Sequence, residues 1–433
     1  MKSRELCFLF LVVLALTSAE PYRFDQFKVF RVRIEAQEQL DVLRSLKTGP
    51  NSYEYFDEPR QIGQELDMMV PPFLQSEFDN MITGTKMNKK LMINNLQELV
   101  DKERPNRAVE NDDEFGWDDY HSIDTINAWM YSLEELYDEV TVIQGGTTYE
   151  GRNILGVNIN RNPGQNPGIF IESQIHAREW ITSGSTTWII NKLLTATTAE
   201  PEYKNLADNI NWYIFPIINV DGYEYTRNVY RMWRKTRSQQ GLICNGVDPN
   251  RNWDVYWEKG GIGSSANMCD GSFAGPEAFS EIETKSLSEY ILSLADNLNF
   301  YISFHSAANM LLFPWGHTNN PSPYYPQFME IATATINALH ARHGTNYTYG
   351  PVYSTIYPTT GISSDWVHYA LGIPGFTYEF RNRNTATGEN YGFLAPPEEI
   401  QPNAEEVLDS LVALVQKATE LGYMTPNAPG RRQ

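Results

Sequence analysis

Residues 168–180, GIFIESQIHAREW, join an apolar strand to the start of a helix. The predicted strand covers Gly168 to Glu172, and helical spacing begins at Trp180 and continues to Leu194. The same alternation continues on both sides. Further strands are predicted at Val140 to Ile143, Ile154 to Ile159, Trp212 to Ile218, Phe300 to Phe304 and Phe376 to Phe380, and further helices at Glu281 to Leu294, Phe328 to His343 and Ala404 to Leu421. This layout predicts an α/β fold with a largely buried mixed central β-sheet flanked by helices.

The quoted stretch also carries a possible metal site. His176 and Glu179 are three residues apart, so on a helical turn both side chains point the same way and can share one ion. Alone, this H-x-x-E spacing is a weak signal, and a surface ion pair is its more common explanation. A third ligand is His305, because it follows the strand Phe300 to Phe304 at its carboxyl end, where open α/β sheets place their ligands. Its alternative is a hydrogen-bonded core histidine. Two histidines and one glutamate would leave an open position, which is typical of catalytic zinc.

Glu379 is a candidate general base. It lies on the strand Phe376 to Phe380 between two aromatic residues, where an unpaired carboxylate is costly. A pair with Arg381 or another arginine is the other explanation. The sequence contains no G-x-S-x-G nucleophile elbow and no phosphate-binding G-x-x-x-x-G-K-[ST] loop.

The N-terminal part predicts a separate small α+β module. Its predicted strand is Lys28 to Ile34, and two further apolar stretches are Leu66 to Val70 and Lys90 to Ile93. Its predicted helices are Glu35 to Leu46, ended by Gly49-Pro50, and a second that runs from Asn94 to about Glu103.

A charged stretch, Asp101 to Glu114, follows the module and indicates an exposed linker. It contains Arg104-Pro-Asn-Arg107, so a trypsin-like or furin-like protease is expected to cut after Arg107. A solvated connector is the alternative. The predicted division is therefore 1–19, 20–107 and 108–433, of which the first segment is an export signal.

The export signal is predicted from the order of its charged, apolar and small residues and from the length of its apolar run. Leu6 to Leu16 is apolar but too short to span a bilayer, and it lies between Lys2 with Arg4 and the small residues Thr17-Ser18-Ala19. The protein is therefore expected to be secreted. Cys244 and Cys269 then remain, and in an oxidising compartment one disulfide is favoured over two free thiols.

Composition excludes some partners. The 433 residues are 41% hydrophobic, which indicates a folded protein, and carry a formal charge of −20, which disfavours nucleic acid and anionic membranes.

Together these features resemble the pancreatic-type zinc carboxypeptidases, the carboxypeptidase A and B family of secreted zymogens. The segments that carry the resemblance are HAREW (176–180), NVDGY (219–223), RMWRKTRS (231–238), GVDPNRNWD (246–254), His305-Ser306, Tyr357 and YGFL (391–394). The resemblance implies that residues 35–103 form an inhibitory activation domain, an antiparallel α+β open sandwich, in front of a mixed-sheet enzyme.

The resemblance also implies residue roles. One zinc ion is expected on His176, Glu179 and His305, with Glu379 as general base and acid. Arg234 matches the arginine that stabilises the oxyanion. The residues that match substrate-binding positions are Arg251, which clamps the C-terminal carboxylate, its neighbours Asn250 and Tyr357, and Arg178, Arg231 and Ser306 at the outer subsites.

Ser364 aligns with the floor of the specificity pocket. It carries no charge, so aliphatic and aromatic C-terminal residues are expected, and Lys or Arg are disfavoured. Two departures from the family pattern stand out. Ala307 replaces a frequent aromatic residue, and Phe380 to Asn390 is longer than usual, forming either a surface bulge or part of the cleft rim. Asn346 begins one glycosylation sequon.

The expected protein is thus a monomeric digestive enzyme that acts on the C-termini of peptides and proteins. One alternative is a regulatory peptide-processing carboxypeptidase, but these enzymes usually lack a folded activation domain and carry an extra C-terminal β-sandwich. The other is an inactive binding protein of the same fold, which predicts a missing ligand or base.

Overall fold

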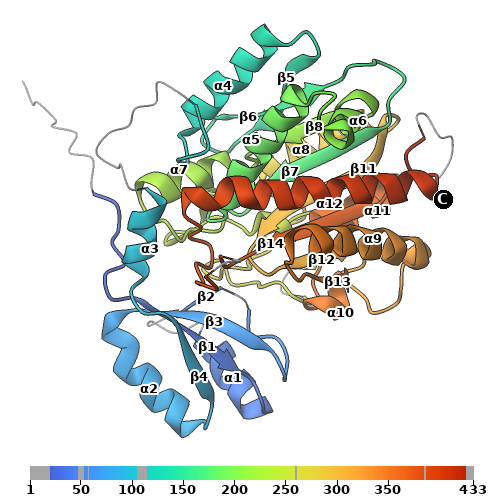
Figure 1. The fold of residues 1–433 in the computed structure, drawn as a ribbon. Coiled ribbons are helices and arrows are strands. Elements are labelled where there is room, and N and C mark those ends of the chain that lie inside the picture. Colours follow the sequence, from blue (N-terminus) through green and yellow to red (C-terminus); the bar gives the residue numbers. More distant parts are fainter. Residues whose placement is uncertain are drawn as a thin grey trace, which may run out of the picture.

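The computed structural model describes residues 20–46, 53–56, 58–104, 115–258, 261–384 and 387–425. They form a small domain (residues 20–104) docked beneath a large domain (residues 115–425), as Figure 1 shows. The predicted signal peptide, Gly49-Pro50 and the expected cleavage at Arg107 lie outside the described residues.

The small domain is an antiparallel sheet with helices on one face. Its sheet has the order β2-β3-β1-β4. Its elements are β1 (Lys28–Arg33), α1 (Gln37–Ser45), β2 (Glu54–Tyr55), β3 (Glu65–Val70), η1 (Pro72–Leu74), α2 (Gln75–Gly84), β4 (Asn88–Ile93) and α3 (Leu96–Glu103). Alternation along β1 explains the docking, because successive side chains point to opposite faces. Phe30 and Val32 pack in the domain's own core, whereas Val29 belongs to the core shared with the large domain.

The large domain is built on a mixed sheet of order β13-β12-β14-β11-β7-β8-β6-β5, which confirms the predicted fold class. Its strands are β5 (Val140–Thr147), β6 (Asn153–Ile159), β7 (Gly168–Ser173), β8 (Asn211–Phe215), β11 (Leu298–Ser306), β12 (Met310–Phe313), β13 (Thr348–Pro351) and β14 (Gly375–Phe380). The central strands β14, β11, β7 and β8 are parallel. Every residue of β7 is buried, because strands flank it on both sides and helices cover both faces.

Helices cover the two faces of this sheet. They are α4 (Ile123–Leu136), α5 (Trp180–Thr195), α6 (Pro201–Asn209), α7 (Val220–Asn228), α8 (Ile282–Ser293), α9 (Tyr325–His343), α10 (Val352–Thr355), α11 (Ser363–Leu371) and α12 (Ile400–Glu420), with short turns η2 (Pro249–Arg251) and η3 (Pro397–Glu399). Two adjacent residues of β7 show on which face of the sheet α5 and α11 lie, because neighbouring side chains of a strand point to opposite faces. Ser173 bonds to Thr186 of α5, and Glu172 bonds to Ser363 of α11, so these helices lie on opposite faces. Figure 1 shows α5, α9 and α12 over the near face.

Some predicted boundaries shift. The strand predicted at Trp212 to Ile218 ends at Phe215, because Pro216 cannot donate to a ladder. The strand predicted at Phe300 to Phe304 runs on to Ser306 and so includes His305. The predicted linker start at Asp101 is wrong, since residues up to Glu103 complete α3. The charged composition indicated solvent, but Glu103 is buried against the large domain.

The predicted disulfide between Cys244 and Cys269 is present. It ties the short hairpin of β9 (Gln239–Gln240) and β10 (Cys244–Asn245) to the loop that follows.

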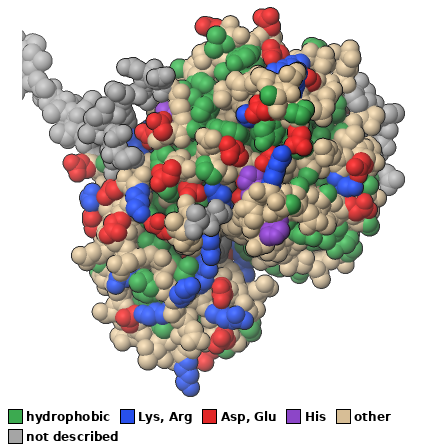
Figure 2. All heavy atoms as spheres, viewed as in Figure 1, with side chains coloured by type: hydrophobic (Ala, Val, Ile, Leu, Met, Phe, Trp, Pro, Cys, Tyr) green, Lys and Arg blue, Asp and Glu red, His purple; other side chains and the backbone are tan. Residues whose placement is uncertain are grey.

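Among the described residues, no helix has the length and apolar character needed to cross a membrane. Acidic and basic side chains are interspersed on the face seen in Figure 2.

Candidate active site

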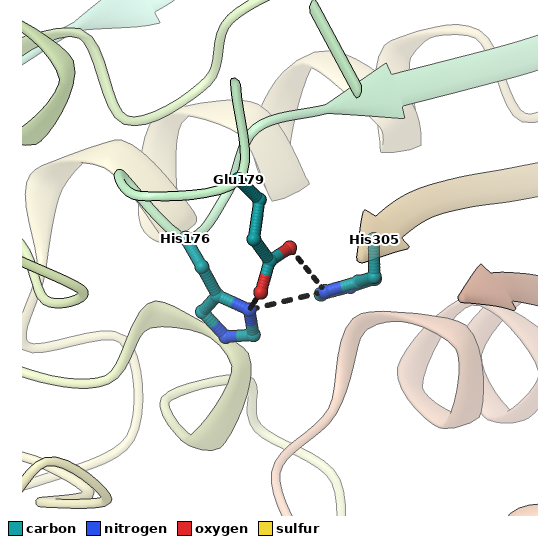
Figure 3. A group of neighbouring side chains, drawn as sticks. All are labelled: His176, Glu179 and His305. Carbon is teal, nitrogen blue, oxygen red and sulfur yellow. Dashed lines mark hydrogen bonds and ion pairs between the residues drawn. The ribbon is translucent and has the colours of Figure 1, made fainter. Parts of the chain in front are cut away.

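Three side chains converge at the carboxyl end of the central strands (Figure 3). His176 and Glu179 come from the turn between β7 and α5, and His305 lies near the end of β11. His176 Nδ1 lies 2.9 Å from Glu179 Oε1, and His305 Nδ1 lies 3.3 Å from Glu179 Oε2. Glu179 is the N-cap of α5 rather than part of a helical turn, and its N–H donates to the His176 carbonyl. A tight turn, not the expected helix, therefore places the pair on one side.

The chemistry of this group fits a metal ion. The three ligand atoms lie within 4.8 Å of one another, and all three residues are buried. His176 Nδ1 and His305 Nδ1 face each other at 3.1 Å. Two imidazole nitrogens and a carboxylate aimed at one point suit a shared cation, and this donor set favours zinc over magnesium or calcium. Three protein ligands leave a coordination position open.

Electrostatics favour the ligand forms of His176 and Glu179. Burial lowers the pKa of His176, and the nearby Arg234 lowers it further, so the imidazole is neutral as a metal ligand must be. Burial alone would raise the pKa of Glu179, but His176 and His305 hold it well below its usual range. The carboxylate is therefore ionised.

Asp248 is the residue of this site that sequence reasoning missed. Its Oδ1 lies 3.2 Å from His176 Nε2, and its Oδ2 accepts hydrogen bonds from Arg234 Nη2 at 3.0 Å and Nε at 3.2 Å. Burial tends to raise its pKa, but Arg234 and Arg251 keep the pKa of Asp248 well below its ordinary value. It lies within GVDPNRNWD (246–254), the segment that also contains Asn250 and Arg251, so this motif is the signal that could have identified it.

Glu379 lies beside the metal-binding group. On β14 it is in register with His305 of the parallel strand β11, and it lines the same cleft as His176 and Glu179. Burial tends to lower the pKa of His305, but Glu179 raises it, and the charge of Glu379 adds to that effect.

Arg381, the alternative partner of Glu379, is bound elsewhere. It forms buried ion pairs with Glu399 at 2.7 Å and Glu406 at 3.2 Å.

The proposed carboxylate clamp is also assembled. Arg251 Nη2 donates to Tyr357 Oη at 3.2 Å, and Arg251 Nε donates to the Gly263 carbonyl at 2.8 Å. Asn250 Oδ1 accepts from the Ser363 N–H at 2.9 Å, and its Nδ2 lies 3.3 Å from His305 Nε2. Backbone and side-chain bonds thus fix the arginine beside the metal-binding group.

Two predicted substrate-binding residues do not line the cleft. Arg231 forms a buried, bidentate ion pair with Glu103 of α3, both contacts at 2.7 Å, and stacks 3.9 Å from the Trp180 ring. Ser364 is buried, and its Oγ accepts a hydrogen bond from Thr377 at 3.2 Å. The other predicted outer-subsite residues, Arg178 and Ser306, do line it.

The cleft, of about 1010 Å³, lies between the two domains. The small domain contributes Glu54, Phe56 and Glu58, and the Phe56 carbonyl accepts from Arg178 Nη2 at 3.1 Å. The long segment after Glu379 contributes Asn382 and other residues to the lining, so it shapes the cleft rim rather than forming a remote bulge.

A mixed sheet with a His/Glu/His group, a neighbouring glutamate and an arginine in one cleft defines a metallopeptidase. Residues 126–410 match the family model for zinc carboxypeptidase, and residues 30–103 match that for the carboxypeptidase activation peptide. The chain belongs to the zinc carboxypeptidase family and carries that family's activation peptide, so it is a zinc metallocarboxypeptidase made as a zymogen.

Named relatives cover nearly the whole chain. It is 39% identical to zinc carboxypeptidase A 1 of Anopheles gambiae, over 95% of this chain and 94% of that protein. It is 34% identical to carboxypeptidase B of Canis lupus familiaris, over 93% and 96%. The crystal structure of thrombin activatable fibrinolysis inhibitor is similar, with a TM-score of 0.83 and 25% identity over 92% of this chain and 100% of that chain. Relatives therefore bear both the A and the B names.

Proposed function

We propose that this protein is a secreted digestive zymogen that, once cleaved after Arg107, releases neutral C-terminal residues from peptides and proteins. The activation domain is then residues 20–107 and the enzyme residues 108–433. One observation carries the proposal: the same cleft contains a group that can bind a metal and a group that can bind a carboxylate. The first is His176, Glu179 and His305 beside Glu379, and the second is Arg251, which is hydrogen-bonded to Tyr357.

Each residue has a definite part in peptide hydrolysis. His176, Glu179 and His305 would hold the zinc ion, which when bound would act as a Lewis acid toward the scissile carbonyl and lower the pKa of water. Glu379 accepts the proton of the attacking water and returns it to the leaving nitrogen. Arg234 places a fixed cation where the oxyanion develops, and Asp248 holds that guanidinium in place.

Exopeptidase action requires recognition of a free C-terminus. Arg251 presents a planar guanidinium that can bind a carboxylate through two parallel hydrogen bonds. Asn250 and Tyr357 complete this clamp. The clamp sets the distance from the chain end to Glu379, so only the last peptide bond reaches the base.

Neutral specificity rests on the surroundings of Ser364. Its hydroxyl partner is Thr377, which is uncharged. A buried carboxyl, Glu172, does contact the preceding Ser363, but three hydroxyl groups occupy its Oε1 and burial raises its pKa. A hydrogen-bonded carboxyl with a raised pKa is a weak counter-charge for Lys or Arg.

The test is hydrolysis of blocked dipeptides ending in Phe, Leu, Lys or Glu, before and after tryptic cleavage, with and without a zinc chelator. The expected result is release of Phe and Leu only after cleavage, abolished by the chelator. Ser364 does not line the cleft of the zymogen, but the family resemblance puts its position at the floor of the specificity pocket, so Ser364→Asp should shift preference toward Lys by about tenfold or more. No hydrolysis by cleaved, zinc-loaded protein would refute the proposal, and preference for Lys in the unmodified enzyme would refute the neutral pocket alone.

A further inference from the structure

The loop between α9 and β13 places an asparagine at the edge of the cleft. Asn346 lies in this loop, two residues before β13 begins, and it is one of the residues that line the cleft. It is also exposed, although the activation domain is docked on the enzyme. Its side-chain amide is therefore reachable from solvent in the complete zymogen.

The residues on either side of Asn346 are anchored in the large domain. Thr345 is buried, and its Oγ1 donates a hydrogen bond to Glu406 of α12 at 2.6 Å. Tyr347 is buried in the core of the large domain. Because both neighbours are held inside the protein, the fold fixes the position of Asn346 on the rim of the cleft.

This part of the rim is joined to the segment that follows Glu379. The Thr348 N–H donates to the Asn309 carbonyl at 3.0 Å, and the Asn382 N–H donates to Asn309 Oδ1 at 3.4 Å. Asn309 and Asn382 also line the cleft. A group attached to Asn346 would therefore start on the rim that borders the proposed general base.

Asn346-Tyr347-Thr348 has the N-x-[ST] pattern of an acceptor for N-linked glycans, and it is the single such pattern in the 433-residue sequence. We propose that Asn346 carries an N-linked glycan, which admits short peptides to the cleft but hinders folded proteins. The inference rests on the proposed secretion of the protein and on the proposed hydrolysis of peptides in this cleft.

The physical basis of this selection is size. An N-linked glycan is bulky and hydrated, and it extends from the surface of the protein. A short peptide can pass beside it into the cleft, whereas a folded substrate has to bring its own surface up to the rim. A clash that only one substrate meets produces discrimination without changing any contact at the reacting atoms.

The mass of the full chain, secreted from a eukaryotic host, tests the glycan. Treatment with peptide N-glycosidase should lower the mass of the unmodified protein by the mass of the glycan. Thr348→Ala keeps Asn346 but destroys the acceptor pattern, so the enzyme should leave its mass unchanged. Thr348→Ser is the matched control, because it keeps the pattern and should keep the glycan. No mass loss in the unmodified protein, or an equal loss in Thr348→Ala, would overturn the modification of Asn346.

The selection by size is tested on the same proteins after tryptic cleavage. The substrates are a short peptide ending in Phe and a folded protein that carries the same peptide as its C-terminal tail. Removal of the glycan should raise kcat/KM for the folded substrate by about threefold or more and leave that for the peptide unchanged. Thr348→Ala should match the deglycosylated enzyme, and Thr348→Ser should match the unmodified one. An unchanged ratio between the two substrates would overturn the selection.

The outcomes separate this inference from the proposed function. If no protein hydrolyses the short peptide, the proposed function fails, whereas the mass measurement still decides whether Asn346 carries a glycan. The affinities of Glu379→Gln enzyme for the two substrates, with and without the glycan, give the selection ratio without any hydrolysis. Equal affinity ratios with and without the glycan would again overturn the selection.

Discussion

Asp248 connects two parts of the active site, because one oxygen faces His176 and the other accepts from Arg234. Asp248→Asn removes the charge that orients the imidazole. Outer-sphere carboxylates of this kind are worth about 10 to 100-fold in metal affinity. We therefore expect Asp248→Asn to lose its zinc at a chelator concentration at least about tenfold lower than the unmodified protein requires. Asp208→Asn breaks a more exposed Asp–Arg pair, with Arg161, and serves as control for the loss of one carboxylate. Equal zinc retention in both variants would contradict this role.

Glu379 is expected to act on protons and not on the metal. Glu379→Gln keeps the size of the side chain but removes the base, so kcat for a Phe-terminated dipeptide should fall by about 10²- to 10⁴-fold. Zinc content, measured on the same protein, should stay at one equivalent. Glu389→Gln, on the same rim segment, should be nearly neutral in the cleaved enzyme. A Glu379→Gln enzyme within tenfold of the original would remove Glu379 from the mechanism.

At the scale of single elements, α8 carries a buried carboxyl with a measurable cost. Burial raises the pKa of Glu283 to about 7, opposed in part by a hydrogen bond from the Tyr149 N–H. Because the folded pKa lies above the unfolded one, stability falls as pH rises from about 4 to 7, by an amount on the order of 3 kcal/mol. Glu283→Gln should therefore raise the melting temperature at pH 8 more than at pH 5.

The control for α8 is Glu289→Gln, which changes an exposed residue of the same helix. Its effect on melting temperature should be small and equal at both pH values. If Glu283→Gln changes the melting temperature equally at pH 5 and pH 8, ionisation of Glu283 does not destabilise the folded protein.

Helices and strands were predicted correctly where the pattern of apolar residues in the sequence reflects their burial in the fold. The strands β7 and β14 and the helix α5 were predicted to within a residue or two, because uniform burial leaves a continuous apolar run and helical spacing marks a sustained period. The helices α7 and α11 were missed. Both are short, and α11 buries polar residues such as Ser363 and Asp365, whose partners come from distant strands and loops.

For the whole molecule, the ion pair of Glu103 with Arg231 is a fully buried polar contact between the domains. Removing one partner of a buried pair costs about 3–5 kcal/mol, so Glu103→Ala should weaken docking of the activation domain by about a hundredfold or more. The measurement is the activity of the cleaved protein over a dilution series. Because the weakly docked activation domain dissociates earlier on dilution, activity should appear at a higher protein concentration in Glu103→Ala than in the unmodified protein.

The adjacent Lys102→Ala is the matched control. Lys102 pairs with Glu389 at 2.9 Å, but both side chains are about half exposed, so the pair contributes little. The released enzyme is identical in every case, because both residues belong to the activation domain. Equal recovery for the two variants would mean that the apolar contacts, such as those of Val29, dominate the docking.

The sequence by itself determined the fold class, the disulfide and the candidates for the metal site. Burial and periodicity are local properties, and the motifs that carry the family resemblance are short and contiguous. Only the tertiary structure decided how side chains pair across the chain. Glu103 meets Arg231 from 128 residues away, Asp248 links His176 to Arg234, and Arg60 of the small domain packs on the Tyr357 ring of the large one. A charged residue shows no local sign of its partner, because the pairing depends on which surfaces the folded core brings together.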